Sequence, residues 1–279
     1  MKIWAALGDG FKITPKFWVA ILFTLVLNAF IGAVSTTVLP YVVVEGQILV
    51  PPITSVEEAA ARFFPTMGVY FFSMAGSLLI LGGTLGCLGQ VTRKSPAVLP
   101  QTYLRSAKRW FLPMVRWGLG FGVATLGSGI VVAALLGFLW GILGQPEWLT
   151  SLIALGFSGT TFAVGLALIF SPFAFTARFL GVWKSFSESF RFIKSHPGGV
   201  VGLIFWISLF GALLKFVDLI LAGGVGGIRT ALGIASFAPG LPVFFFNLIL
   251  GLPSAFLTAF IPVTLYSYYS GNTQSNPSA

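Results

Sequence analysis

Residues 183–197 read WKSFSESFRFIKSHP and lead directly into an apolar run that starts at Gly198. The same order of basic and aromatic residues, then a proline, then apolar residues occurs earlier around Pro15 and around Pro113. Each copy is followed by two long apolar segments. Because Lys, Arg and Trp are typical of the membrane–water interface, the sequence predicts three helical hairpins in a membrane, each preceded by an interfacial helix on the cytoplasmic side.

The composition supports a membrane protein. The chain has 279 residues, of which 56% are hydrophobic and only 8% are charged, and its mean hydropathy is +0.95. Soluble domains carry about 25% charged residues, so this chain has too few charges to cover a water-facing surface. No polar block is long enough for a soluble domain, and we expect residues 1–279 to form a single transmembrane domain.

Six apolar stretches are long enough to cross roughly 30 Å of hydrocarbon as helices. The predicted fold class is therefore an all-α polytopic membrane protein with six transmembrane helices. The third stretch is longer than a bilayer needs, so we expect it to tilt or to start on the membrane surface. The stretches are residues 17–43, 66–88, 110–143, 151–177, 198–222 and 241–266.

The distribution of charge predicts the orientation. Thirteen of the 16 Lys and Arg residues fall at the N-terminus, in or flanking the second-to-third connection, or in the fourth-to-fifth connection, whereas four of the seven acidic residues fall in the other connections. Basic residues accumulate in cytoplasmic loops, so both termini should be cytoplasmic, in a bacterial inner membrane. The same pattern accounts for the net charge of +9 without a nucleic acid partner.

The three hairpins form internal repeats in the sequence. Residues 170–181 align with residues 260–271, proline to proline and glycine to glycine. A proline within a helix removes one hydrogen bond and clashes with the preceding turn, so Pro172 and Pro262 should kink their helices. The repeat units are about 1–92, 93–180 and 181–270, and residues 271–279 should form a disordered tail.

Two outer connections carry specific expectations. Ser55 followed by Glu58 is a capping-box pattern, so residues 55–62 should form a short helix in the first outer loop. Residues 223–240 are rich in glycine, which predicts a flexible outer turn, with a re-entrant segment covered by the bundle as the alternative.

The stretch from Ser171 to Phe190 carries a family resemblance. In it, a helix ends at a proline, and Gly181 leads into an amphipathic helix with an Ala/Ser-x-x-x-Ser pattern before the next span. This layout resembles bacterial six-helix membrane proteins of uncharacterised function and the membrane domain fused to some glycerophosphodiester phosphodiesterases, mainly over residues 165–215. No soluble phosphodiesterase domain accompanies the spans in this sequence, so the resemblance implies the membrane fold and transfers no catalytic residue.

The lead-in at residues 183–194 should be an amphipathic helix. Trp183, Phe186, Phe190 and Ile193 recur at three- and four-residue spacing, which predicts one apolar stripe. Such a helix should lie among anionic lipid headgroups, and a groove for a protein partner is the alternative. The interfacial residues expected to contact lipid or a partner are Arg105, Lys108, Arg109, Trp110, Trp183, Lys184, Arg191 and Lys194.

Few polar side chains fall within the spans. Lys215 and Asp218 are three residues apart and share a helix face, so they could form a proton or ion relay or a local ion pair near the outer interface. Their place in the last third of the span favours the local ion pair, with Lys215 snorkelling outward. Asn28 and Asn247 should form interhelical hydrogen bonds, with a polar path for a solute as the alternative.

Pairs of glycines at four-residue spacing permit close contact between membrane helices, and we expect these contacts within the bundle. The pairs are Gly82/Gly86, Gly118/Gly122 and Gly137/Gly141.

No set of residues in the sequence points to catalysis. The chain has one Cys, one His and seven acidic residues, and no nucleophile–base, paired-carboxylate or metal-ligand pattern occurs. We therefore expect no enzyme activity, catalytic residue, metal or cofactor. The sequence predicts a structural or accessory subunit of a larger assembly of membrane proteins. The alternative is a transporter or channel for a lipid-like or small solute, with a cavity between the three hairpins.

Overall fold

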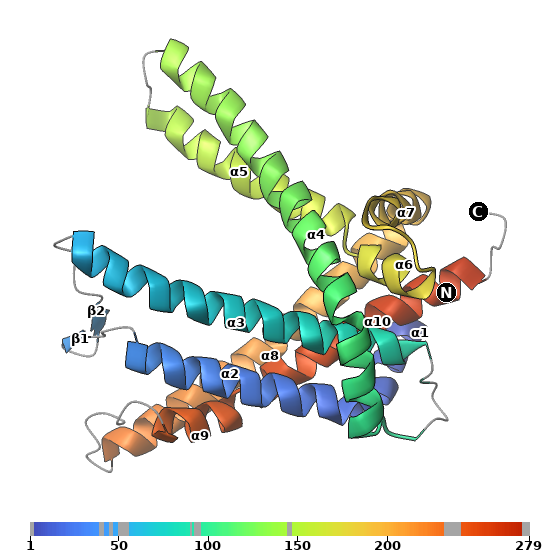
Figure 1. Ribbon diagram of the computed structural model, residues 1–279, viewed down its shortest axis with the longest axis horizontal. Coiled ribbons are helices and arrows are strands. Elements are labelled where there is room, and N and C mark those ends of the chain that lie inside the picture. The colour runs from blue at the N-terminus through green and yellow to red at the C-terminus, as the bar shows by residue number, and fades with distance from the viewer. Residues whose placement is uncertain are drawn as a thin grey trace.

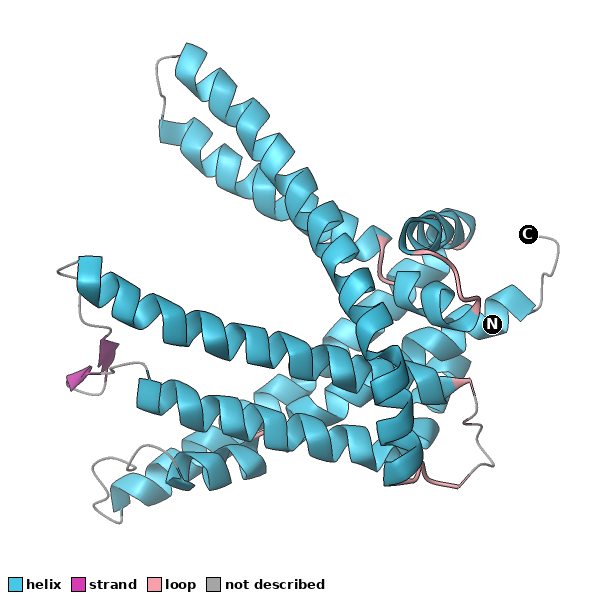
Figure 2. Ribbon diagram, in the orientation of Figure 1, coloured by secondary structure: helices cyan, strands magenta, loops and turns pink. Residues whose placement is uncertain are grey.

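The computed structural model describes residues 3–38, 42–44, 47–49, 56–89, 91, 96–143, 147–231 and 241–274. These residues are helical apart from loops and a small antiparallel ribbon of β1 (Val42–Val44) and β2 (Gln47–Leu49), as Figure 2 shows. Six helical stretches are long and apolar enough to cross a membrane. The predicted helical, multi-pass class is confirmed, and the ribbon is the one addition to it among the described residues.

The helices follow the chain in a simple order. They are α1 (Ile3–Ile13), the 3-10 turn η1 (Thr14–Phe17), α2 (Trp18–Val38), α3 (Val56–Leu88), α4 (Pro100–Ile142), α5 (Glu147–Ala167), α6 (Ser171–Ala177), α7 (Val182–Ser195), α8 (Pro197–Ala231), α9 (Leu241–Leu250) and α10 (Leu252–Gln274).

Several boundaries differ from the sequence prediction. The helix expected at residues 55–62 is not separate, because α3 runs unbroken from Val56 to Leu88. The lead-in around residues 103–113 is continuous with its span in α4, and residues 223–231 extend α8 instead of forming a turn. A helix gives the backbone of an apolar segment the hydrogen bonds that lipid cannot supply. Residues 232–240 lie outside the described part of the chain.

The first four residues of the expected tail are helical. Residues 271–274 belong to the last turn of α10, where the Thr273 hydroxyl donates to Tyr269 O at 3.0 Å. Residues 275–279 lie outside the described part.

Two spans are interrupted, at different positions relative to the aligned prolines. α5 ends at Ala167, and Pro172 lies in the first turn of α6, where its missing N–H costs no intrahelical bond. The last span is split at Gly251, whose N–H donates to Asn247 O at 2.8 Å. α10 then continues past Pro262 to Gln274.

The helices diverge into two groups in Figure 1. α2 packs against α3, α9 and α10, and α8 also contacts α9 and α10. α4 contacts α3 near the end where both termini lie, then rises away from it with α5 alongside. We call residues 122–142 of α4 and 147–163 of α5 the arm, and the other helices the body.

The hydrophobic core lies in the body at the end of the molecule near the termini. In apolar 18-residue windows, 44% of the residues in α3 and 33% in α10 are buried, against 11% in α4 and 6% in the α5–α6 stretch. The arm is therefore packed almost only against itself. The largest fully buried side chains of the core include Phe17, Tyr103, Met114, Phe170, Phe173, Phe260 and Tyr269.

Candidate functional site

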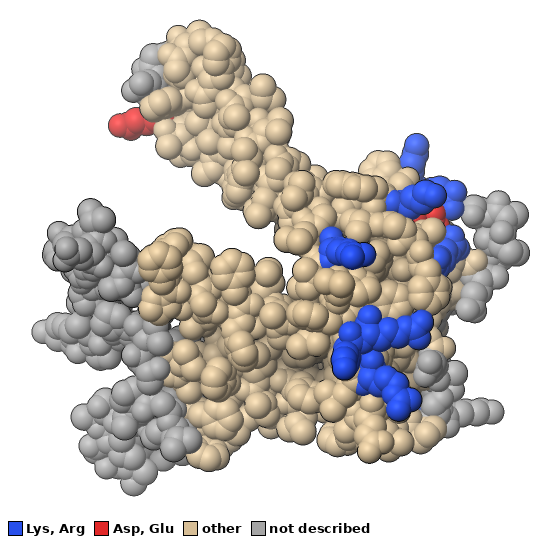
Figure 3. Space-filling view, in the orientation of Figure 1, with Lys and Arg blue, Asp and Glu red and all other residues tan. Residues whose placement is uncertain are grey.

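Positive charge gathers at the end of the molecule that holds both termini. Figure 3 shows this segregation on the visible face, with an acidic side chain at the far tip of the arm, where α5 starts at Glu147. The sequence-predicted interfacial residues lie at the basic end, on the first turns of α4 and on α7. Their exposed members are Arg105, Lys108, Arg109, Trp183, Lys184, Arg191 and Lys194, and Trp110 is half-buried.

A cavity of about 310 Å³ lies at this basic end. It forms where the end of α3, the start of α4, the end of α6 and the middle of α10 meet. The wall therefore takes residues from each third of the chain. The lining residues are Leu85, Gly86, Gly89, Arg109, Trp110, Thr176, Ala177, Phe179 and Tyr266.

The polar groups of this cavity are mostly hydrogen-bond donors. Arg109 supplies a guanidinium, Trp110 an indole N–H and Tyr266 a phenolic hydroxyl. None of the three has a hydrogen-bond or carboxylate partner among the described residues, and the lining includes no acidic residue. Thr176 is different, because its hydroxyl already donates to Pro172 O at 2.8 Å.

Glycines give the cavity its width. A Cβ at Gly86 would lie 2.6 Å from Cδ1 of Trp110, so only glycine lets α3 approach the indole at this point. A Cβ at Gly89 would meet only the Tyr266 hydroxyl, at 3.7 Å. The wall at Gly89 therefore borders open space, with the hydroxyl opposite.

Phe179 holds an unusual backbone conformation at the rim of the cavity. Its φ is +51°, the one positive value for a described non-glycine residue, and such a conformation costs about 1–3 kcal/mol for a bulky side chain. The conformation places the Phe179 ring 5.5 Å from the Trp110 ring at an interplanar angle of 26°. The strained residue therefore builds one aromatic wall of the cavity.

The buried face of α7 differs from the predicted stripe. Phe186 is buried, whereas Trp183 and Phe190, expected to contact lipid, are 65% and 60% exposed. The helix instead buries Ser185, Ser189 and Phe192 against the body. The apolar spacing did not indicate this second face, because a hydroxyl can be buried where a backbone group accepts or donates a hydrogen bond.

The buried hydroxyl of Ser189 makes hydrogen bonds to the backbone at the break between α5 and α6. Its hydroxyl donates to Ala167 O at 2.8 Å and accepts from Phe170 N at 3.2 Å. Both backbone groups belong to the turn where the fourth span is interrupted, so Ser189 satisfies a helix end that would otherwise be orphaned. The sequence signal for this buried face is the pair Ser185 and Ser189, four residues apart. The spacing of the apolar residues does not reveal it.

Ion pairs join α7 to the end of α6. Glu188 accepts hydrogen bonds from Arg178 and from Arg191, each at 2.8 Å. Arg191 was predicted as a lipid or partner contact, and the structure places it in this pair. Arg109, which lines the cavity, has no such carboxylate among the described residues.

The intramembrane polar residues lie in separate places. Lys215 donates to Ser254 Oγ at 2.8 Å, which joins α8 to α10, and the side chain of Asp218 lies outside the described part of the structure. Asn247 is half-buried on α9, where a Cβ at Gly32 of α2 would collide with its amide. Asn28 is exposed on α2. The described side chains of Lys215, Asn247 and Asn28 thus lie on three different helices, α8, α9 and α2.

The glycine pairs divide between body and arm. Cβ atoms at Gly82 and Gly86 would press on Trp110, and one at Gly118 would contact Leu78, so these glycines do permit close packing in the body. Cβ atoms at Gly122, Gly137 and Gly141 would meet no atom within 4 Å. For the Gly137/Gly141 pair, the predicted contact within the bundle is not formed among the residues that the structure describes.

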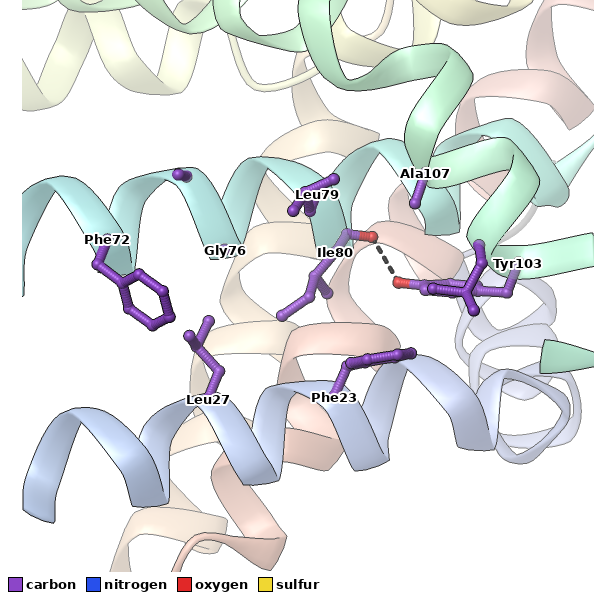
Figure 4. Close-up of a pocket in the computed structure, with 10 residues that line it drawn as sticks. Phe23, Leu27, Phe72, Gly76, Leu79, Ile80, Tyr103 and Ala107 are labelled. Atoms are coloured by element: carbon purple, nitrogen blue, oxygen red, sulfur yellow. Dashed lines mark hydrogen bonds between the residues drawn. The ribbon is translucent and has the colours of Figure 1, made fainter. Parts of the chain in front are cut away.

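An apolar groove of about 270 Å³ lies between α2, α3 and the start of α4. Figure 4 shows Phe23 and Leu27 on one side, Phe72 and Gly76 on the other. Tyr103, the one polar side chain in its lining, already donates its hydroxyl to Ile80 O at 2.8 Å. With no unpaired polar group, this groove suits acyl chains and offers no group for chemistry.

The described residues contain no group of three His, Cys, Asp or Glu side chains placed to hold a metal ion. Comparison with known proteins found no match to any family model, any curated protein or any solved structure. The fold and the cavity therefore define the class reached above, a helical multi-pass membrane protein with one basic end.

Proposed function

We propose that this chain is a non-catalytic subunit of a larger membrane assembly and that its arm docks against the helices of a different membrane protein. The observation that carries this proposal is the exposure of the arm. Apolar windows of α4 and of the α5–α6 stretch bury only 11% and 6% of their residues, although the two helices pack closely against one another.

The arm also offers the surface chemistry that membrane helices use to associate. Gly137 and Gly141 lie one turn apart with open space above each, which lets a second backbone approach closely. Exposed large apolar side chains lie on or beside this face of the helix, including Ile130 at 59% and Phe138 at 70% exposure. Lipid chains could cover such a face whatever its small residues were. A partner helix, in contrast, would pack closely into the space above the two glycines.

The orientation follows from charge. We propose that the basic end faces the cytoplasm of a bacterial cell, with both termini there, and that the helices form three hairpins with their lead-in helices at the inner-membrane surface. The accumulation of Lys and Arg at one end and Glu147 at the other supports this orientation under the positive-inside rule. α7, with its exposed Trp183 and Phe190, suits the headgroup layer.

Site-specific photo-crosslinking in native membranes tests the docking of the arm. A photoreactive side chain at Phe138 should give one discrete adduct with another membrane protein, and the same adduct should form from Ile130, which lies two turns before Gly137 on the same face. Replacing Gly137 and Gly141 with Leu should abolish it, while the same change at Gly127, another open glycine of the arm, should not. An adduct at twice the mass of the chain would assign the face to a second copy, and lipid adducts alone would refute the proposal.

The alternative function is a transporter or channel for a lipid-like or small solute. The cavity where all three repeat units meet favours it. Reconstituted vesicles should then show movement of lipid or solute that falls when Asn28, Asn247, Lys215 and Asp218 are replaced. Unchanged flux in that variant would exclude the predicted polar path.

A further inference from the structure

The cavity at the basic end combines features of an anion site with features of a lipid site. Its unpaired donors are Arg109, Trp110 and Tyr266, and its other walls are largely apolar. We infer that this cavity binds the phosphodiester headgroup of an anionic phospholipid, with Arg109 as the cation that holds the phosphate.

The donors fit a phosphate oxygen better than any other ligand group. A guanidinium binds phosphate through parallel N–H donors, and an indole N–H and a phenol can each donate one more bond. The lining has no carboxylate that would repel an anion. Arg178, which lies between the lining residues Ala177 and Phe179, and Arg191 are already paired with Glu188. Arg109 is the one basic residue of the cavity lining.

The depth and size fit a headgroup. The cavity lies at the end of α3 and in the third turn of α4, which is the interfacial level of a chain whose apolar spans extend away from it. A volume of about 310 Å³ is at the small end of the range for small-molecule sites, so it accommodates a headgroup and leaves the acyl chains outside. The exposed Phe179 ring and Leu85 offer apolar walls for the start of those chains.

The strained backbone of Phe179 supports a built site. A positive φ at a phenylalanine persists only where the surroundings enforce it, and here it sets the ring against Trp110. That stack holds the indole at the cavity wall, where its N–H can donate. The inference is independent of the arm, so failure of the proposed subunit role would leave it standing, and the reverse also holds.

Native mass spectrometry of the delipidated full-length protein tests the site. The protein in mild detergent is titrated with phosphatidylglycerol, with phosphatidylcholine, and with phosphatidylglycerol in excess inorganic phosphate. We expect one phosphatidylglycerol to be retained at least about tenfold more tightly than phosphatidylcholine, in keeping with charge-assisted hydrogen bonds to the ligand.

Two variants and one control locate the binding. Arg109→Gln removes the cation, and Gly89→Leu fills the cavity without changing charge; each should weaken phosphatidylglycerol binding about tenfold. Lys108→Gln removes the same charge from an exposed neighbour outside the lining and should change binding less than about threefold. Retained helicity and melting temperature show that each variant is folded.

The outcomes that overturn the inference are distinct. Equal losses in Arg109→Gln and Lys108→Gln would mean diffuse attraction to the basic surface. Full affinity in Gly89→Leu would place the lipid elsewhere. Displacement of phosphatidylglycerol by inorganic phosphate at a similar concentration would assign the cavity to a free phosphate instead of a lipid.

Discussion

A Cβ at Gly83 in the body would lie 2.6 Å from Cζ of Tyr103, whereas a Cβ at Gly137 in the arm would meet no atom within 4 Å. Both glycines lie in apolar helices of similar hydropathy. The difference shows that composition identifies both segments as membrane helices. It does not show which faces of these helices pack against other helices of the same chain. Gly83 is covered by the Tyr103 ring and Gly137 is open, but each group contains both kinds, as the open Gly68 of the body and the covered Gly129 of the arm show.

The largest expected effect comes from filling these two kinds of glycine. Gly83→Val should lower the free energy of unfolding by about 3 kcal/mol, because the added side chain would overlap the buried Tyr103 ring and displace its hydroxyl from Ile80 O. Gly137→Val should change the stability of the isolated chain by less than about 0.5 kcal/mol. Thermal unfolding of both variants in detergent measures the contrast. Equal destabilisation would mean that Gly137 is packed against other residues of the chain in solution.

A smaller effect should follow from loss of the bridging hydroxyl in the body. Ser189→Ala leaves the Phe170 N–H and the Ala167 carbonyl without their partner, which should destabilise the chain by about 2 kcal/mol. The exposed Ser187 on the same helix provides the control, since Ser187→Ala should be nearly neutral. If the two variants have the same melting temperature, the stability of the turn between α5 and α6 does not depend on Ser189.

The smallest effect is expected for the ion pairs of α7. Glu188→Gln removes the contacts to Arg178 and Arg191, but these arginines are 43% and 62% exposed, so solvent screening limits the loss to less than about 1 kcal/mol. The loss should shrink further in 1 M salt, where the screening length is about 3 Å. Glu147→Gln at the arm tip serves as the control. A loss that is independent of salt would contradict this account.

The six spans could be predicted because the length and hydropathy of a segment suffice to identify a membrane helix. α7 could also be predicted, from the basic and aromatic residues around Trp183 and Lys194. Its buried face could not, because Ser189 is stabilised there only by a backbone turn more than 15 residues earlier in the chain. Periodicity records which residues are apolar and not which polar groups find partners.

The cavity was beyond sequence reasoning for a related reason. Arg109 and Trp110 were singled out as interfacial residues, but Phe179 and Tyr266 were not. Gly86, Trp110, Phe179 and Tyr266 meet only through the packing of four helices, and no spacing in the sequence brings them together. A bulky residue at positive φ leaves no sequence pattern either, since glycine or asparagine is the usual occupant of that conformation.

The length of α4 has a mechanical consequence. This helix contains Arg109 near one end and the open glycines near the other, with Pro113 between them. At 1.5 Å per residue, the part from Pro113 to Ile142 is about 44 Å long. A proline weakens the helix locally, so α4 can act as a lever with its pivot beside the cavity. A rotation of one degree at that pivot would move the tip by about 0.8 Å, so a small displacement at the basic end would be magnified at the tip of the arm.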